Sequence, residues 1–434
     1  MTNLAYDISS DGDEAAPRSP EARPIPRITI QAFCDTPEIA GTIETAAMDR
    51  RMSRAHVKVH TGGINAATEF YRSAPTPNLI MVETRLDVDG LISALDGLAE
   101  VCDAGTKVMV IGHSNDVRLY RELLKRGVSE YLVAPTDVMT IITAISGVYH
   151  ESGTEKLGRV YAFIGAKGGV GSSTVAHNVA WTMARLVGSD VILADLDMAF
   201  GTAGLDFNLD PPQGIAEAVF GADRLDEVLL DRLLAKCEEH LSLLTAPAAL
   251  DKAYDFGEEA FEQVLEIIQA NVPTVVLDVP HLWTAWVRKT LIAADEVVIT
   301  AVPDLANLRN AKSIVDLLRA ARPNDTPPKL ILNQVGVPKR PEIKPDDFAA
   351  ALQIAPIATI PFDPLLFGTA ANNGQMIAEA SAKTAVADAF TDIAQVVTGR
   401  KELKKARRRG LDFGPLLSRL KSKPKPKSKS KKAS

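Results

Sequence analysis

The chain has 434 residues, 46% of them hydrophobic, which is enough for two or three domains with ordinary cores. Its three cysteines, Cys34, Cys102 and Cys237, lie far apart without metal-ligand spacing, and this fits a reducing compartment better than a disulfide framework. The sequence shows neither a secretory leader pattern nor a run of about 18 apolar residues, so we expect a cytoplasmic protein.

Charge is distributed unevenly along the chain. Residues 400–434 carry 15 Lys or Arg against two acidic residues, whereas the first 399 residues carry 33 basic and 53 acidic ones. The excess of acidic residues in the first 399 does not favour nucleic acid as a partner, so any polyanion would bind to the basic C-terminal tail. The apolar cluster LDFGPLLSRL before the lysine run predicts reversible contact with an anionic membrane. A solvated tail that only aids solubility is the alternative.

The first 150 residues alternate short β-type runs with helical patterns. Residues 1–26 are rich in Asp, Glu, Pro and Ser and are expected to be disordered. The alternation that follows predicts a five-stranded parallel sheet covered by helices over residues 27–150. Its strands are expected at 28–33, 57–59, 78–82, 107–111 and 130–133, and helical patterns at 91–101 and 117–127.

A second α/β unit is expected over residues 160–399, after a polar break of linker type at 151–159. Its strand candidates are apolar on both faces, as a buried parallel sheet requires, so we predict a doubly wound parallel sheet. A last helix is expected at about 375–397, before the tail at 400–434. The strand candidates are 160–165, 191–195, 241–246, 274–278, 296–300, 329–333 and 357–361.

The stretch GAKGGVGSST, at 165–174, joins the first of these strands to a helical pattern. Its glycines allow the backbone to turn tightly and direct N–H groups at phosphate oxygens, and the helix N-terminus adds partial positive charge. Ser173 stands at the hydroxyl position that ligates Mg²⁺, and Ser172 stands where such loops carry a lysine. Lys167, just before the glycines, can supply the positive charge instead. A glycine-rich turn kept only for close packing is the alternative. The predicted nucleotide-binding residues are Gly168, Gly169, Val170, Gly171, Ser172, Ser173 and Thr174.

Three acidic residues follow predicted strands. Asp195 and Asp197 lie two residues apart just beyond one strand and therefore point the same way, and Asp278 ends another. Because carboxyl ends of strands meet at one crevice in a doubly wound sheet, we predict that Asp195 and Asp278 ligate Mg²⁺ together with the loop serine. Asp197 is predicted to position the attacking water. His177 and His281 flank this place, and lone histidines on such a scaffold are more often structural than catalytic.

The early lysine of KGGVGSST, the D-x-D after the next strand and the segment LDVP together resemble the deviant Walker A ATPases of the MinD/ParA family. The resemblance covers about residues 158–398 and implies a P-loop NTPase fold, ATP and Mg²⁺ as cofactors, and a nucleotide-sandwich homodimer. It implies that Lys167 contacts phosphate in the partner subunit. It also implies that Asn333, in LILNQV, and Pro361, in ATIPFDP, lie beside the adenine.

Longer segments resemble one particular family within this group. LDVPHLWTAW, PDLANLRNAKSIVDLL, LNQVGVPKRPEI and FGTAANNGQMIAE are similar to those of the CpaE/TadZ family, which localises Flp/Tad pilus assembly machinery. Serine at position 172 is also similar to many members of that family. The loss of one charged hydrogen bond, about 1.5 to 3 kcal/mol, bears on the rate of hydrolysis more than on nucleotide binding.

The first domain resembles a response-regulator receiver with altered site residues. Glu83 stands at the end of the third strand, where a receiver has its phosphorylated aspartate. Asp35 is the only acid of the expected pair after the first strand, and Ala134 replaces the lysine before Pro135. We interpret the domain as a pseudo-receiver that docks onto secretion machinery or a polar landmark.

These observations predict an ATP-binding, ATP-dependently dimerising protein that localises pilus assembly machinery at the cell pole. Slow ATP hydrolysis would depend on Lys167, Asp195 and Asp197. The expected location is the cytoplasm, at the pole and peripherally at the membrane, without nucleic acid as a partner. Two alternatives remain open at this point: a nucleotide-gated scaffold without significant turnover, and a partition-type ATPase that uses its basic tail on DNA.

Overall fold

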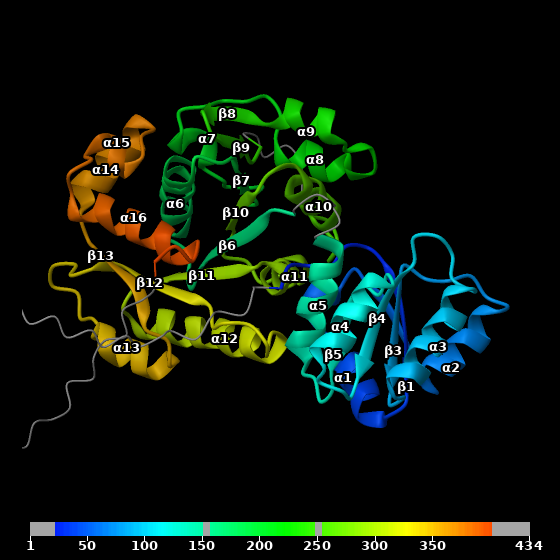
Figure 1. The fold of residues 1–434 in the computed structure, drawn as a ribbon. Helices are drawn as coiled ribbons and strands as arrows, with labels where there is room; N and C mark the ends of the chain where they lie inside the picture. The colour runs from blue at the N-terminus through cyan, green and yellow to red at the C-terminus, as the bar shows by residue number, and fades with distance from the viewer. Residues whose placement is uncertain (1–21, 151–156, 248–253, 402–434) are drawn as a thin grey trace, which may run out of the picture.

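The computed structural model describes residues 22–150, 157–247 and 254–401, which form two sheets with helices on both faces of each (Figure 1). The C-terminal tail from residue 402, the segment before residue 22 and most of the predicted linker lie outside the described residues. Within the described part of the chain, every helix is too short or too polar to span a bilayer.

The first sheet has five parallel strands in the order β2-β1-β3-β4-β5, as predicted. β3 is buried along its whole length because helices cover both of its faces, which explains its continuous apolar run. The strands are β1 (Thr29–Cys34), β2 (His56–Thr61), β3 (Leu79–Thr84), β4 (Lys107–Gly112) and β5 (Glu130–Val133).

Two layers of helices cover this sheet. On one face α1 (Pro37–Ala47) and α5 (Val138–His150) share a core, and on the other lie α2 (Gly63–Tyr71), α3 (Val88–Ala99) and α4 (Val117–Lys125). A short 3-10 helix, η1 (Arg50–Met52), follows α1. Residues 22–26 were expected to be disordered, but Ile25 is buried and its N–H bonds to the carbonyl of Arg51 at 2.8 Å, so the packed part of this domain begins before residue 27.

The second sheet has eight strands in the order β13-β12-β11-β6-β10-β7-β9-β8. All seven predicted strands are present and parallel. β6 lies in the middle of the sheet, and later strands lie on both of its sides, so the strand order reverses there. The eighth strand, β8, is antiparallel and was not predicted, because it is a four-residue edge strand with polar residues. The predicted linker also ends earlier than expected, since β6 starts at Arg159. The strands are β6 (Arg159–Gly165), β7 (Val191–Asp195), β8 (Ala235–Glu238), β9 (Leu241–Leu244), β10 (Thr274–Val279), β11 (Glu296–Ala301), β12 (Lys329–Val335) and β13 (Pro356–Pro361).

Helices again lie on both faces, with two separate apolar cores (Figure 1). The helix predicted at 375–397 is two helices, because Thr384 accepts a hydrogen bond from the N–H of Ala387 and starts a new one. One face carries α6 (Ser172–Val187), α7 (Ala203–Asp206), α14 (Pro364–Asn373), α15 (Ile377–Ala380) and α16 (Ala385–Val397). The other carries α8 (Ile215–Phe220), α9 (Glu227–Leu233), α10 (Glu262–Asn271), α11 (Ala285–Ala293), α12 (Leu305–Ala321) and α13 (Pro345–Leu352).

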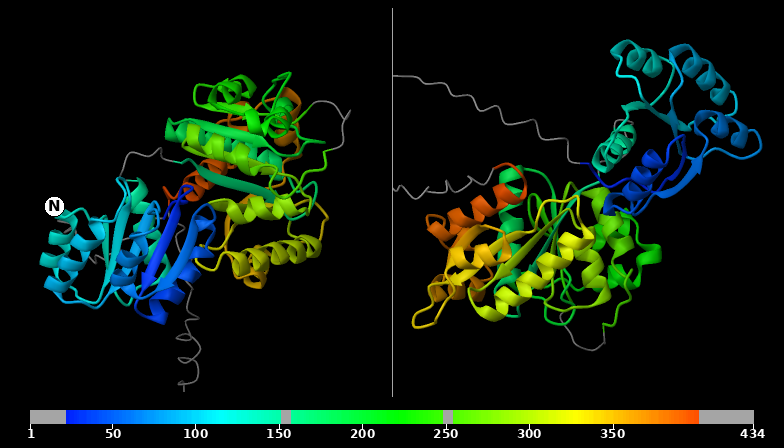
Figure 2. Two further views of the ribbon diagram at one scale, coloured as in Figure 1. Left: turned by 90° about the vertical axis from the view of Figure 1, so that its right-hand side faces the viewer. Right: turned by 90° about the horizontal axis from the view of Figure 1, so that it is seen from below.

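A cluster of buried charges joins the two domains, which lie side by side in both views of Figure 2. Asp325, just after α12, pairs with Arg50 and Arg51 of the first domain and with Arg322 of its own domain. Arg50 also reaches Asp295 at 3.3 Å. We call these five side chains the interdomain cluster.

Candidate nucleotide site

The predicted phosphate loop links β6 to α6 at the centre of the second sheet. Gly169 and Gly171 have φ angles of +77° and +83°, in the left-handed region that favours glycine. At Gly168 and Gly169 an added Cβ would meet nothing within 4 Å, whereas at Gly171 it would lie 2.6 Å from Nδ2 of Asn333. The first two glycines therefore leave space beside the loop, and the third allows a close contact behind it.

Amide side chains hold the loop from behind. Asn333 donates to the carbonyl of Val170 at 2.8 Å, and Gln334 donates to that of Gly169 at 3.1 Å. Asn333 is buried, and its amide serves the loop itself. Pro361 pairs with Val335 at the end of β13 and is exposed. The two residues expected beside the adenine thus lie on the neighbouring strands β12 and β13, and Asn333 contacts the loop directly.

Polar groups of the loop remain available to a ligand. Lys167, Gly168 and Gly169 are exposed, and Ser173 lies in the first turn of α6. The Oγ atom of Ser172 is buried and has no hydrogen-bond partner, although buried polar atoms normally have one. An orphaned hydroxyl at a helix N-terminus, beside glycines that leave open space, fits a bound phosphate.

The structure brings Asp195 and Asp278 together, although they are far apart in sequence. They are register partners on β7 and β10, the strands that follow β6 on one side of the sheet, and both are buried. Asp195 accepts hydrogen bonds from the N–H groups of Asp197 and Ala203, at 3.1 and 3.0 Å. Burial and then the charge of Asp278 raise the pKa of Asp195. Two buried acids side by side need positive charge close by.

Asp197, predicted to position water, lies on the turn after β7 and is partly buried. Its carboxylate accepts a hydrogen bond from the N–H of Phe200 at 3.0 Å. In this structure it therefore caps its own turn.

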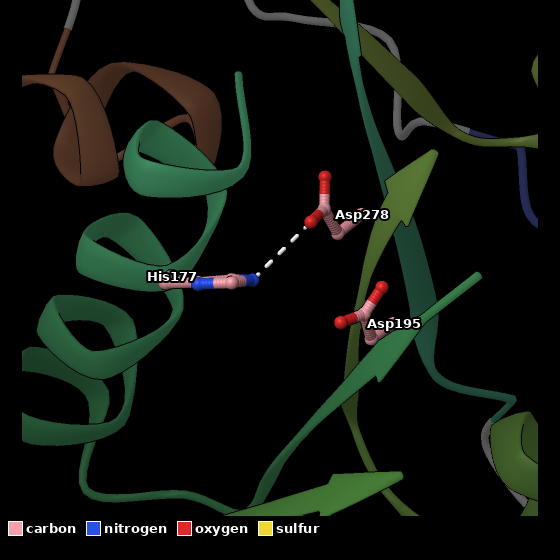
Figure 3. A group of neighbouring side chains, drawn as sticks. All are labelled: His177, Asp195 and Asp278. Atoms are coloured by element: carbon pink, nitrogen blue, oxygen red, sulfur yellow. Dashed lines mark ion pairs between the residues drawn. The ribbon is translucent and has the colours of Figure 1, made fainter. Parts of the chain in front are cut away.

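His177 is the residue of this site whose role the sequence did not reveal. It is fully buried on α6, and its ring points at Asp278 (Figure 3). Nδ1 lies 2.7 Å from Oδ2 of Asp206, and Nε2 lies 3.2 Å from Oδ2 of Asp278 without an aligned hydrogen bond. Burial alone lowers the pKa of His177, but its interactions with Asp206 and Asp278 outweigh burial and raise the pKa to about 10. The two carboxylates therefore favour the protonated form of the ring.

The acids and the histidine form a compact set of potential metal ligands. One ligand atom each of His177, Asp195 and Asp278 lies within 4.8 Å of the others. Carboxylate oxygens suit Mg²⁺, and both nitrogens of His177 already face carboxylates. The donor set thus fits a cation held by the two acids.

In the first domain, the residues at the predicted receiver site contact one another. Glu83 is buried at the end of β3 and accepts hydrogen bonds from the N–H and the hydroxyl of Thr36, both at 2.8 Å. His113 lies 3.1 Å from the same carboxylate. Burial and then the charge of Glu83 raise the pKa of the neighbouring Asp35. Both oxygens of Glu83 are engaged.

Comparison with known proteins supports these assignments of fold. A family model described as an AAA domain matches residues 158–327. The septum site-determining protein MinD of Synechocystis is 27% identical over 252 residues, 56% of this chain and 91% of that protein. The crystal structure of a ParA family ATPase from Chlorobium tepidum is 23% identical and covers 55% of this chain and 98% of that one, with a TM-score of 0.50, which shows a shared fold.

The second domain thus shares its fold with a ParA family ATPase and carries a glycine-rich loop at the end of its central strand, and a five-stranded α/β domain precedes it. A pilus assembly protein CpaE from Caulobacter crescentus CB15 is 54% identical to this chain; the match covers 29% of this chain and 96% of that one, with a TM-score of 0.29. A CpaE2 pilus assembly protein from Sinorhizobium meliloti 1021, described as putative in its source, is 45% identical over 98% of its length and 28% of this chain, with a TM-score of 0.27. By this sequence identity and coverage, the chain belongs to the CpaE pilus assembly protein family.

Proposed function

We propose that this protein binds ATP with Mg²⁺, dimerises when ATP is bound, and localises Flp/Tad pilus assembly machinery at the cell pole, with slow ATP hydrolysis. The observation that carries the proposal is the position of the phosphate loop at the end of the central strand β6, next to Asp195 and Asp278 on the adjoining strands. Ligands bind at such reversal points in open α/β sheets. The pilus role is taken from membership of the CpaE family.

The residues of the site have the following proposed roles. Backbone N–H groups of residues 168–174 bind the phosphates, and Ser173 with Asp195 and Asp278 holds Mg²⁺, which neutralises phosphate charge. Lys167, exposed at the front of the loop, contacts a phosphate in the partner subunit. Asn333 and Pro361 border the adenine.

Exposed apolar side chains support a dimer face around this site. Monomeric surfaces seldom gather large apolar side chains, yet here they follow the carboxyl ends of four strands, on the edge of the sheet that carries the phosphate loop. Leu365 and Leu305 are 79% and 74% exposed. The side chains are Phe200 and Leu205 after β7, Leu282 and Trp283 after β10, Leu305 after β11, and Phe362 and Leu365 after β13.

Light scattering with and without ATP and Mg²⁺ tests the dimer. We expect the wild-type protein to double in mass when ATP is added, and Lys167→Ala to stay monomeric. Lys339→Ala, at a lysine in the turn after β12, is the control and should dimerise normally. ATP-dependent dimerisation of Lys167→Ala would refute the nucleotide-sandwich arrangement.

Phosphate release from purified protein separates an ATPase from a nucleotide-gated scaffold. We expect slow release that falls in Asp197→Ala. Release no greater than in Asp197→Ala would favour the scaffold, which the serine at position 172 supports as the second candidate.

The first domain is proposed to dock onto secretion machinery or a polar landmark, since Glu83 is unsuited to the aspartyl phosphorylation of a receiver. The basic tail is proposed to touch an anionic membrane. Removal of residues 401–434 should abolish sedimentation with anionic liposomes. If removal instead abolishes sedimentation with DNA, the partition-type alternative is favoured.

A further inference from the structure

His177 completes a closed circle of contacts around the two acids. The carboxylate of Asp195 accepts from the N–H of Ala203, the first residue of α7, and the last residue of that helix, Asp206, contacts Nδ1 of His177 at 2.7 Å. Nε2 of the same ring contacts Asp278 at 3.2 Å. The backbone closes this circle of contacts, because the N–H of Leu196, next to Asp195, donates to the carbonyl of Asp278 at 3.0 Å.

The contact with His177 involves one oxygen of Asp278. That oxygen, Oδ2, faces the imidazole, and the other points away from it (Figure 3). The carboxylate of Asp278 can rotate about its side-chain bonds. The negative charge of the neighbouring Asp195 disfavours the orientation that the carboxylate of Asp278 has in this structure. A planar ring fixed by Asp206 on its far side resists that rotation.

We infer that His177 is a positioning residue for a divalent cation: clamped by Asp206, it orients the carboxylate of Asp278 so that Asp278 and Asp195 together can hold the ion. His177 is not itself a ligand, because both of its ring nitrogens face carboxylates. Groups that orient a metal ligand in this way typically contribute 10- to 100-fold to metal affinity. The inference deepens the proposed function and rests on its assignment of Asp195 and Asp278 as cation ligands.

Two substitutions separate the two contacts of the ring. The amide nitrogen of His177→Asn can replace Nδ1 and retain Asp206, whereas that of His177→Gln can replace Nε2 and retain Asp278. We expect His177→Asn to weaken Mn²⁺ binding at least about tenfold and His177→Gln to stay within about threefold of wild type. Mn²⁺ titration followed by electron paramagnetic resonance, without nucleotide, measures this directly. His240→Gln, which alters an exposed histidine–aspartate pair with Asp190, is the control and should bind Mn²⁺ as wild type does.

Comparison of Mn²⁺ affinity with melting temperature distinguishes positioning from a structural role. Each variant loses one of two contacts, so a structural role predicts similar melting temperatures and similar Mn²⁺ affinities for both. Equal Mn²⁺ affinities of the two variants, wild-type affinity in His177→Asn, or no Mn²⁺ binding by the wild-type protein would each overturn the inference. Failure of the wild-type protein to bind a fluorescent ATP analogue with Mg²⁺ would instead refute the proposed function and leave the Mn²⁺ comparison valid.

Discussion

Asp325 is the centre of the interdomain cluster, and Asp325→Asn is expected to destabilise the protein strongly. Its carboxylate contacts three arginines, Arg50, Arg51 and Arg322, whose side chains are all less than 10% exposed. Asparagine keeps the shape of the side chain but removes the negative charge, so the arginine charges stay buried without full compensation. Breaking a buried ion pair by removing one partner costs about 3 to 5 kcal/mol, and the expected loss in unfolding free energy lies in that range.

Urea unfolding of the full chain measures this loss. Asp316→Asn is the matched control, because Asp316 lies on α12 in an exposed pair with Lys312, and its loss should cost less than about 1 kcal/mol. A double-mutant cycle of Asp325→Asn with Arg50→Met isolates the part that crosses between the domains, and we expect a coupling energy of about 1 to 3 kcal/mol. A coupling energy near zero would refute the docking of the two domains through this cluster.

The pH dependence provides an independent test of the same cluster. Burial alone raises the pKa of Asp325, but the charges of Arg50, Arg322 and Arg51 outweigh burial and lower it below its ordinary value of 3.8. A carboxyl whose pKa is lower in the folded state stabilises the protein above its ordinary pKa, and this stabilisation is lost as the pH falls through the folded value. The difference in stability between wild type and Asp325→Asn should therefore be constant from pH 7 to about 5 and shrink below about pH 4. A difference that shrinks between pH 7 and 5 would contradict this assignment.

Three further changes test the phosphate loop. Gly171→Ala, at a φ of +83° and facing Asn333, should lower thermal stability by about 1 to 3 kcal/mol and weaken ATP binding; wild-type melting would disprove the close contact. Asn333→Ala removes the donor to the buried carbonyl of Val170 and should lower the unfolding free energy measured in urea by about 1 to 3 kcal/mol. A loss below 0.5 kcal/mol, roughly the error of such a measurement, would show that this contact is absent. Ser172→Lys should tighten binding of a fluorescent ATP analogue about tenfold by adding a charged donor, and unchanged affinity would mean that position 172 does not face the phosphates.

The sequence predicted strands well where burial on both faces produced continuous apolar runs. β6, β10 and β11 lie in the middle of the second sheet and match the predicted ranges to within a residue or two. β8 escaped prediction because an edge strand lacks that apolar pattern. The break before α16 was also missed, since the capping threonine stands in a stretch whose composition is otherwise helical.

The site was harder to predict than the strands. Glycine spacing and strand ends indicated the loop, Asp195 and Asp278, because these signals are local in sequence. That Asp278 is the register partner of Asp195 depends on β10 inserting between β6 and β7, an order that the sequence does not display. Asp206 gave no signal at all, since it ends a four-residue helix in a connecting segment.

His177 could have been identified by a physical rule that combines two local signals. On α6 it lies four residues after Ser173, one helical turn further along the same face, and therefore next to the acids that the serine is expected to meet. Two buried acids require positive charge, and a lysine would supply a single mobile ammonium group. An imidazolium presents donors on opposite edges of a rigid plane, so one ring contacts Asp206 and Asp278 at once. A histidine four residues after the serine of a phosphate loop, in a chain with buried strand-end acids, is therefore better interpreted as their partner than as an isolated core residue.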